Sequence, residues 1–277
     1  MTVRIVTDSA SDLTEAEAAE LGVEIVPLTI RFGDEEFTDR KDLTPTEFYA
    51  RLAASPVLPE TAAPSPGAIE TVFPTLLGGG ADTIVCVNIS SGLSATIQSA
   101  NQAARAVDAD VRVVDSRSIT WGLGSQVVAA ALAAQEGKGA DEIVATVEGM
   151  VPRTRVYGAL DTLENLKKGG RVGGAQAMLG TLLSIKPIID ISTGVVEEGG
   201  KPRTRAKALR VLTDKVAEAG EIENLSVMHG GAPDLDQFLD LLGATHPVDA
   251  IHVGEIGATI GVHGGPRVMG VTFQVPG

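Results

Sequence analysis

Hydrophobic and polar positions in the first half of the chain alternate between a period of two and a helical period. Short β-branched runs predict strands at Val3–Thr7, Val23–Ile30, Thr83–Val87 and Val111–Val114. Segments with helical spacing predict helices near Gly67–Leu77, Ser94–Val107 and Trp121–Gln135. A regular alternation of strands and helices is typical of an α/β fold with a parallel sheet.

Three helix starts carry a capping-box pattern, in which a side chain that accepts a hydrogen bond from the N3 amide precedes a glutamate by three positions. The pairs are Thr14 with Glu17, Thr44 with Glu47, and Asp161 with Glu164. The pattern predicts that a helix begins directly after each of the three leading residues.

The regular alternation loosens before Pro152, and we place a domain boundary there. Residues 1–152 are expected to form an N-terminal α/β domain with a parallel sheet, and residues 153–277 a C-terminal domain of mixed α+β structure. The predicted strands of the second domain are Arg155–Ala159, Pro187–Ile191, Leu225–His229, Ala250–Val253 and Val268–Val275. Its predicted helices lie near Asp161–Lys167, Ala175–Ser184, Ala206–Ala219 and Leu235–Leu242. A turn at Gly199-Gly200 predicts a hairpin between Val195-Val196 and Lys201–Arg205.

The composition narrows the classes of function. The 277 residues contain 22 Lys and Arg against 36 Asp and Glu, which gives a formal net charge of −14, and 44% of the residues are hydrophobic. An acidic surface repels nucleic-acid phosphates and anionic lipids, so we expect no nucleic-acid partner and at most transient membrane contact. Cys86 is the only cysteine, so the sequence offers no disulfide framework and no thiolate metal site. No signal peptide or membrane-length apolar span is recognisable, which predicts a cytoplasmic protein.

Four polar clusters follow predicted elements, at positions where open α/β sheets bind ligands. The first, Thr7–Asp12, is either the polar floor of a crevice or a turn that leads into the Thr14 cap, and we favour the turn. In the second, Pro59–Pro66, prolines hold the hydroxyl groups of Thr61 and Ser65 in place.

The third cluster, Asn88–Thr96, joins a strand, a glycine turn and a helix start and is rich in hydroxyl groups. Ser91 and Ser94, together with helix N-terminal amides, would bind an anion, although Ser94 serves equally well as a simple N-cap. The fourth, Lys167–Gly174, lacks the Walker spacing and follows a helix, which indicates a helix C-cap with flanking cations. His263 lies among glycines that allow a ligand to approach closely.

The catalytic options are few. The four histidines are scattered and no HExxH motif is present, so the sequence predicts no metal site. Ser94, His263 and Asp8 form a conceivable catalytic triad, but no spacing fixes its geometry. What remains is a set of hydroxyl and amide donors that includes Thr61, Ser91 and Ser94. Such donors suit a carboxylate or a phosphate group.

Taken together, these residues resemble the DegV family of bacterial fatty-acid-binding proteins. The matching segments extend over the whole chain, and their order and spacing carry the resemblance. They are Ile5–Ser9, Val26–Leu28, Thr61–Ser65, Ser90–Ser94, Val114–Ser116, Lys168–Arg171, Ile185–Pro187 and His263–Pro266. Three loops depart from the family pattern: Thr-Ala-Ala-Pro replaces Thr-Ser-Gln-Pro, Ser-Ala-Thr replaces Ser-Gly-Thr, and Arg267 follows Pro266 where the family has glycine.

The resemblance implies a two-domain α/β fold, with a long-chain fatty acid buried between the parallel-sheet domain and the mixed α+β domain. It implies that Thr61 and Ser94 hold the carboxylate, with Ser91, Arg171 and His263 as neighbours of the head group. It also implies a carrier that has no cofactor and no chemistry of its own, and that presents the carboxylate to a separate fatty acid kinase subunit for acyl phosphate formation.

Other interpretations of the sequence stay open beside this resemblance. A serine-dependent acyl hydrolase or transferase would use Ser94 as the nucleophile and His263 as the base. The basic stretch Lys201–Lys207 is either a docking site for a partner or a solvated hairpin edge. The aliphatic segment Ala175–Leu183 either lines a narrow tunnel or belongs to the core.

Overall fold

The N-terminal sheet is fully parallel and has the strand order β2-β1-β6-β7. In the computed structural model, which describes residues 2–178 and 185–277, its strands are β1 (Val3–Asp8), β2 (Val23–Val26), β6 (Thr83–Asn88) and β7 (Asp110–Asp115). Each strand begins within one residue of its predicted start. The predicted parallel α/β layer is therefore confirmed.

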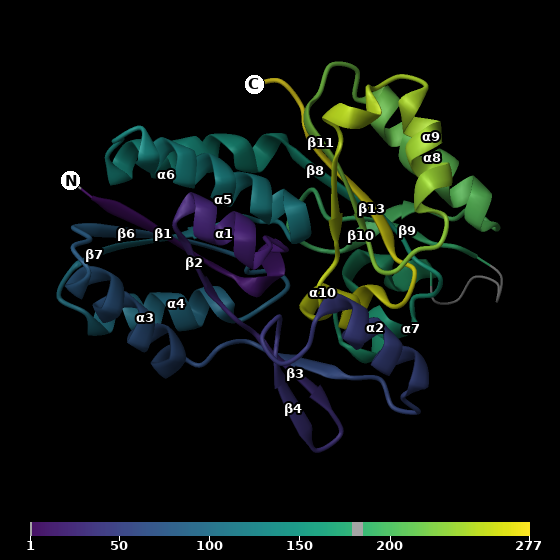
Figure 1. The fold of residues 1–277 in the computed structure, drawn as a ribbon. Helices are drawn as coiled ribbons and strands as arrows, with labels where there is room; N and C mark the ends of the chain where they lie inside the picture. The colour runs from purple at the N-terminus through teal and green to yellow at the C-terminus, as the bar shows by residue number, and fades with distance from the viewer. Residues whose placement is uncertain (1, 179–184) are drawn as a thin grey trace.

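Alternating residues of this sheet face two different helix layers. Helices α3 (Pro66–Gly78) and α4 (Thr96–Ala106) lie below the sheet in Figure 1, and α5 (Thr120–Gln135) and α6 (Ala140–Met150) lie above it. Val6 and Cys86 pack with α3 and α4, whereas Val85 and Val87 pack with α5 and α6. Because successive side chains of a strand point to opposite faces, the continuous apolar runs in the sequence fill both layers.

A small antiparallel sheet with the order β4-β3-β5 branches from the end of β2. It contains β3 (Thr29–Phe32), β4 (Glu35–Thr38) and β5 (Glu60–Ala62), and α2 (Pro45–Ala54) follows β4. The prediction of one strand over Val23–Ile30 is wrong, because the structure divides this segment into β2 and β3. Pro27 has no amide hydrogen to continue the parallel ladder, and the chain changes sheets there.

The C-terminal sheet is mixed and has the order β10-β9-β8-β13-β11-β12. Its strands are β8 (Thr154–Ala159), β9 (Ile188–Asp190), β10 (Glu197–Gly200), β11 (Glu223–His229), β12 (His252–Glu255) and β13 (Met269–Gln274). Helices α8 (Arg205–Glu218) and α9 (Leu235–Gly243) cover one face, where Val271 and Phe273 are buried. Gly270 and Thr272 point to the opposite face, which lines a cavity.

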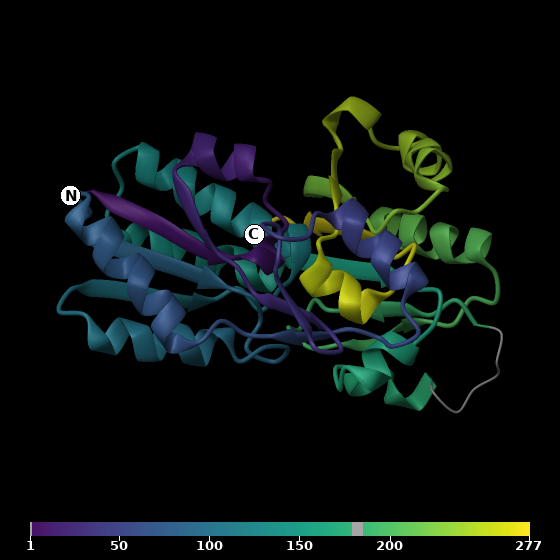
Figure 2. The ribbon, with the colours of Figure 1, turned by 60° about the horizontal axis from the view of Figure 1, so that its bottom comes forward.

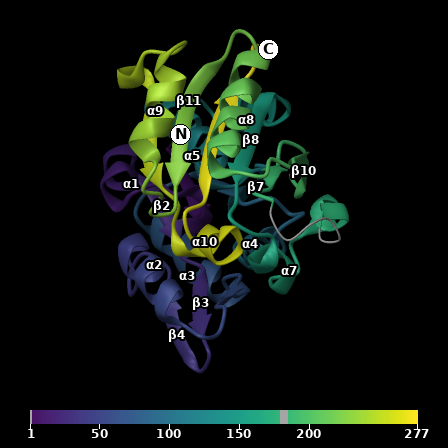
Figure 3. The ribbon, with the colours of Figure 1, turned by 90° about the vertical axis from the view of Figure 1, so that its right-hand side faces the viewer.

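Three shorter helices complete the fold, α1 (Glu15–Leu21), α7 (Glu164–Lys168) and α10 (Ala258–Gly264). Figures 2 and 3 show α10 beside α2, although the two helices are far apart in the sequence. Short 3-10 helices cover Ser9–Ser11, Val151–Arg153, Gly173–Met178 and Val248–Ala250. The helix predicted near Ala175–Ser184 is a 3-10 helix as far as Met178. Residues 179–184 lie outside the described residues, and with them most of Ala175–Leu183, the segment that was expected to line a tunnel or belong to the core.

Two local predictions are wrong. The capping boxes at Thr14 and Thr44 are confirmed, but α7 begins at Glu164 after an N-cap at Leu163, and the Asp161 carboxylate pairs with Lys186 and Arg267 instead. Gly199-Gly200 is not a hairpin turn, because both glycines lie within β10, which pairs with β9. In the basic stretch after this strand, Lys201 forms an ion pair with Glu198, and Arg205 with Asp234.

Candidate functional site

A largely apolar cavity lies between the inner face of the C-terminal sheet and the loops that follow β5, β6 and β7. Its volume is about 160 Å³, roughly ten times the space that one water molecule requires. Ile89, Ile119 and Leu28 contribute walls from the first half of the chain, and Val156 and Met228 contribute walls from the second half. None of the described residues that line it is acidic.

The cavity gathers four of the five predicted site residues. Thr61, Ser94, Arg171 and His263 all lie in its lining, although they come from β5, the β6–α4 loop, the segment after α7, and α10. The fifth, Ser91, is exposed outside this group. Its hydroxyl donates to Asp115 Oδ2 at 2.5 Å, and its amide donates to Asp115 Oδ1 at 3.2 Å.

Thr61 and His263 form the central polar pair of the cavity. Thr61 Oγ1 lies 3.0 Å from His263 Nε2. The pairing of Thr61 with Ile30 in the small sheet fixes the threonine, and α10 fixes the histidine. Gly169 makes room for the imidazole ring, because a Cβ atom at this position would lie 2.3 Å from Nδ1.

His263 is uncharged at neutral pH. Burial, and to a smaller extent the nearby charge of Arg171, lower the pKa of His263 to about 4. The neutral ring carries one proton, and only the tautomer with hydrogen on Nε2 donates to Thr61 Oγ1. In that tautomer the Thr61 hydroxyl keeps its own hydrogen free for an oxygen atom of a ligand.

Arg171 supplies a positive charge at the same end of the cavity. Its Nε donates to the carbonyl oxygen of Leu93 at 3.1 Å, and its Nη1 donates to that of Gly169 at 2.7 Å. None of the ion pairs within residues 2–178 and 185–277 involves Arg171. Since carbonyl oxygens orient the guanidinium without neutralising it, its charge is available to an anion.

Ser94 lies beside this cation, in the turn that Arg171 contacts through Leu93. The Ser94 hydroxyl lies 2.8 Å from Thr96 Oγ1 and accepts the amide hydrogen of Thr96 at 3.3 Å. The N-cap of α4 is therefore Ala95 and not Ser94. Gly92 allows the turn to approach the second half of the chain, because a Cβ atom there would lie 2.8 Å from the carbonyl oxygen of Gly194.

A second, more polar cavity of about 240 Å³ adjoins this end. It shares Thr61, Arg171 and His263 with the first cavity and adds Lys168 and Glu60. The three shared residues therefore line both the apolar cavity and the more polar one. This arrangement suits a ligand with a long apolar body and one anionic group.

The conceivable triad of Ser94, His263 and Asp8 is not joined by hydrogen bonds in the described part of the chain. Ser94 bonds to Thr96, His263 bonds to Thr61, and Asp8 accepts from two backbone amides. Residues 2–178 and 185–277 also hold no group of three or more His, Cys, Asp or Glu that could bind a metal ion. Every helix in these ranges is too short or too polar to span a bilayer.

Sequence reasoning missed three threonines of the cavity, Thr120, Thr259 and Thr272 of β13. Thr120 has a left-handed backbone (φ 46°) at the start of α5, and Thr259 lies in the first turn of α10. The spacing of Ile256, Ile260 and His263 is helical and would have indicated one face of α10, but the glycines around it obscured the pattern.

Comparison with known proteins places the chain among relatives of the same length. A protein of Deinococcus radiodurans described as a DegV domain-containing protein is 35% identical over 99% of both chains. The structure of a fatty-acid-binding DegV family protein from Thermus thermophilus has a TM-score of 0.91 and 34% identity, with complete coverage of both chains. The structure of a stearic acid-binding protein from Eubacterium ventriosum has a TM-score of 0.87 and 26% identity, and covers 99% of this chain and 98% of its own.

The family model described as "Uncharacterised protein, DegV family" matches residues 2–275. This match includes every residue of the cavity lining, and the Deinococcus radiodurans and Thermus thermophilus proteins, both described as DegV proteins, align with at least 99% of the chain. The chain belongs to the DegV family.

Proposed function

We propose that this protein binds a long-chain fatty acid, with the acyl chain in the apolar cavity and the carboxylate beside Thr61, Ser94, Arg171 and His263. The observation that carries the proposal is the combination, in one cavity, of apolar walls without an acidic residue and a cation at one end. The Thermus thermophilus and Eubacterium ventriosum proteins, which bind a fatty acid and stearic acid, support it.

The energetics of the two parts of the ligand match the two parts of the site. Each buried methylene group contributes about 0.8 kcal/mol, so a long acyl chain supplies most of the affinity. A buried carboxylate costs several kcal/mol unless hydrogen bonds and a cation offset the lost hydration. The hydroxyl groups of Thr61 and Ser94 and the charge of Arg171 provide this compensation, while neutral His263 orients Thr61.

We further propose that the carboxylate is presented to a separate kinase subunit, which forms the acyl phosphate. The second, more polar cavity supports this role, because Thr61, Arg171 and His263 line it as well. In this role the protein is a cytoplasmic carrier that needs no cofactor and supplies no catalytic group. Ser91 then has a structural role: its two hydrogen bonds to Asp115 stabilise the turn that contains Ser94, and Ser91 does not touch the ligand.

Lipid mass spectrometry of the denatured, freshly purified protein tests the proposal. We expect close to one fatty acid per chain in the wild type and a large loss in the double variant Thr61→Val/Ser94→Ala. Each substitution removes a carboxylate partner and weakens binding by about 1–3 kcal/mol. The matched control is Thr146→Val/Ser99→Ala, which makes the same two changes on α6 and α4 away from the cavity.

The outcomes separate the ligand from the site. A wild type without fatty acid would overturn the binding proposal. Full retention in Thr61→Val/Ser94→Ala would support fatty-acid binding but would mean that residues other than Thr61 and Ser94 hold the carboxylate. Equal losses in the site variant and the control would indicate damage to the fold rather than a head-group site.

A further inference from the structure

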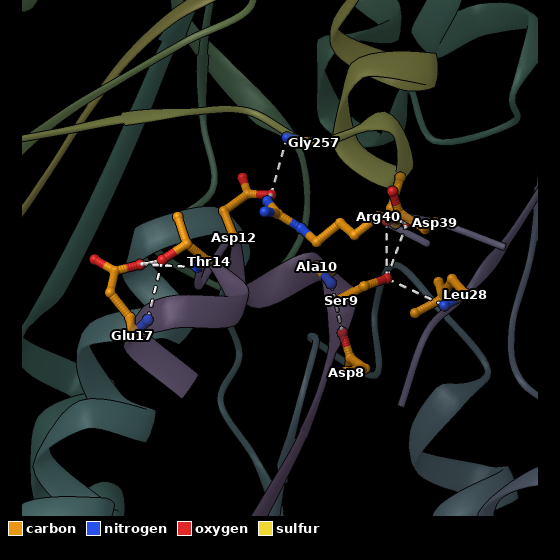
Figure 4. A network of polar contacts seen from close by, with 11 residues as sticks. Asp8, Ser9, Ala10, Asp12, Thr14, Glu17, Leu28, Asp39, Arg40 and Gly257 are labelled. Carbon is orange, nitrogen blue, oxygen red and sulfur yellow. Dashed lines mark hydrogen bonds and ion pairs between the residues drawn. The ribbon is translucent and has the colours of Figure 1, made fainter. Parts of the chain in front are cut away.

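A buried polar network joins the first half of the chain to the start of α10. Figure 4 shows it at the end of β1, beneath the turn that leads into α10. The Asp39 carboxyl group accepts hydrogen bonds from Ser9 Oγ at 2.8 Å and from Thr259 Oγ1. Ser9, Asp39 and Thr259 are each at most 3% exposed, so this contact is fully shielded from water.

A second contact lies beside the first. Asp12 Oδ1 accepts from Arg40 Nη2 at 2.7 Å and from the backbone amide of Gly257 at 2.9 Å. A Cβ atom at position 257 would lie 2.9 Å from both Asp12 Oδ1 and Arg40 Nη2, so a larger residue there would displace these side chains. Asp12 and Arg40 therefore hold the residue that precedes α10, and Asp39 holds its first turn.

The network reaches the lining of the cavity at two points. Thr259 lines the cavity directly, and the same helix carries Ile260 and His263 into the lining. In the first half of the chain, Ser9 Oγ accepts the amide hydrogen of Leu28 at 3.1 Å, and Leu28 also lines the cavity. A movement of α10 away from Ser9 and Asp39 would therefore widen the cavity and separate His263 from Thr61.

Two features of the network favour its opening. Asp12 and Arg40 adopt left-handed backbone angles (φ 57° and 65°), which are unfavourable for residues other than glycine. Asp39 Oδ1 and Arg40 Nε are buried without a hydrogen-bond partner among the described residues. Opening would hydrate these atoms, which offsets part of the cost of breaking the contacts of the network.

We infer that Ser9, Asp12, Asp39, Arg40, Gly257 and Thr259 form a latch that holds α10 closed over the fatty acid and opens to admit or release it. The inference rests on the proposed function, since it assigns the route by which that ligand enters and leaves. These residues are positioning residues, because they act on the ligand through α10 and Leu28.

The test measures both directions of exchange with radiolabelled stearate. We expect Thr259→Val to accelerate transfer from the protein to phosphatidylcholine vesicles and uptake from those vesicles, each about tenfold. The affinity should change less than either rate, because an easier opening accelerates both uptake and release. Thr259→Ser retains the hydroxyl group and should restore both rates. Ser9→Ala, which does not line the cavity, should accelerate them as Thr259→Val does.

The matched control is Thr154→Val. Thr154 is 4% exposed, donates its hydroxyl hydrogen to the carbonyl oxygen of Met150 at 2.9 Å and accepts from Gln126 Nε2 at 3.4 Å, so the substitution also removes buried hydrogen bonds. It lies outside both the latch and the cavity lining, and both transfer rates should match the wild type. Rates in Thr259→Val that equal those of this control would overturn the latch.

Two further outcomes are decisive. Faster release without faster uptake would show a loss of stability rather than an opening, and would overturn the latch while fatty-acid binding stands. A wild type that takes up no stearate would overturn the proposed function itself. If the variants fail to fold, hydrogen exchange of the wild type decides. The amide of Gly257, which donates to Asp12 Oδ1, should exchange at least as fast as stearate leaves, and lasting protection of this amide through release would contradict the latch.

Discussion

His263 is the residue whose protonation most directly affects the polar end of the cavity. Its pKa is lowered from 6.5 to about 4, mainly by burial and then by Arg171. Between these two pH values the unfolded chain binds more protons at this histidine than the folded chain does. The free energy of unfolding therefore falls as the pH falls from about 6.5 to about 4.

The size of this effect is measurable by urea unfolding of the ligand-free protein. By pH 4 the wild type should lose about 3 kcal/mol of stability at this residue, and His263→Gln should not show this loss. Asp8, whose pKa burial raises to about 6, acts in the opposite direction over the same range. The test is therefore the difference between the two proteins at each pH, and a difference that does not change with pH would contradict it.

Thr61, Ser94 and His263 could be singled out from the sequence because each lies in an unusual local pattern. Thr61 sits in a proline-rich loop, Ser94 in a glycine turn and His263 among glycines, and the structure brings all three to one cavity. Thr259 has no such pattern, because its role arises from a contact with Asp39, 220 positions away. Ser91 has the same local pattern as Ser94, but a long-range partner, Asp115, holds it outside the cavity.

At the scale of elements, local signals fail where a distant contact is stronger. The Gly199-Gly200 pair is typical of a turn, yet a Cβ atom at Gly199 would lie 2.9 Å from Ile188 Cγ2 in the neighbouring strand. Glycine is there because two strands approach closely, not because the chain reverses. Asp161 likewise has the spacing of a capping residue, but two cations from other segments hold its carboxylate.

Helix α10 is the clearest element that tertiary packing stabilises against its own sequence. Gly261 lies in its middle, and a Cβ atom there would lie 2.5 Å from Phe48 Cε1 and 2.7 Å from Tyr49 Oη. Alanine has the higher helix propensity, by about 1 kcal/mol. The clash with α2 outweighs this gain, since overpacking typically costs about 1–3 kcal/mol.

We expect Gly261→Ala to lower the free energy of unfolding and Gly149→Ala to leave it equal or raise it. Gly149→Ala is the matched control. It makes the same substitution in α6, at a position where a Cβ atom meets nothing within 4 Å. Urea unfolding of both variants beside the wild type gives the comparison. If Gly261→Ala were as stable as Gly149→Ala, the packing of α10 on α2 would not be tight enough to restrict the helix.

At the scale of the whole molecule, one apolar core extends through both halves of the chain. Ile5 and Val85 of the N-terminal sheet belong to the same buried cluster as Met228 and Val268 of the second half. The boundary near Pro152 separates two sheets in the sequence, but this cluster and the contact of α10 with α2 connect them in space. A ligand in the cavity would touch residues of both halves, and its binding energy would oppose the unfolding of each.

Calorimetry with and without stearate tests this coupling. Because the ligand binds only the folded chain, stearate at a thousandfold excess over its Kd should stabilise the protein by about 4 kcal/mol. We expect one unfolding transition that shifts as a whole to higher temperature, since neither half keeps its share of the cavity when the other unfolds. Methyl stearate, which has the same chain without the charge, should shift it less, because Arg171 then has no anion to bind. Two separate transitions, of which stearate moves only one, would mean that the ligand is held by one half alone.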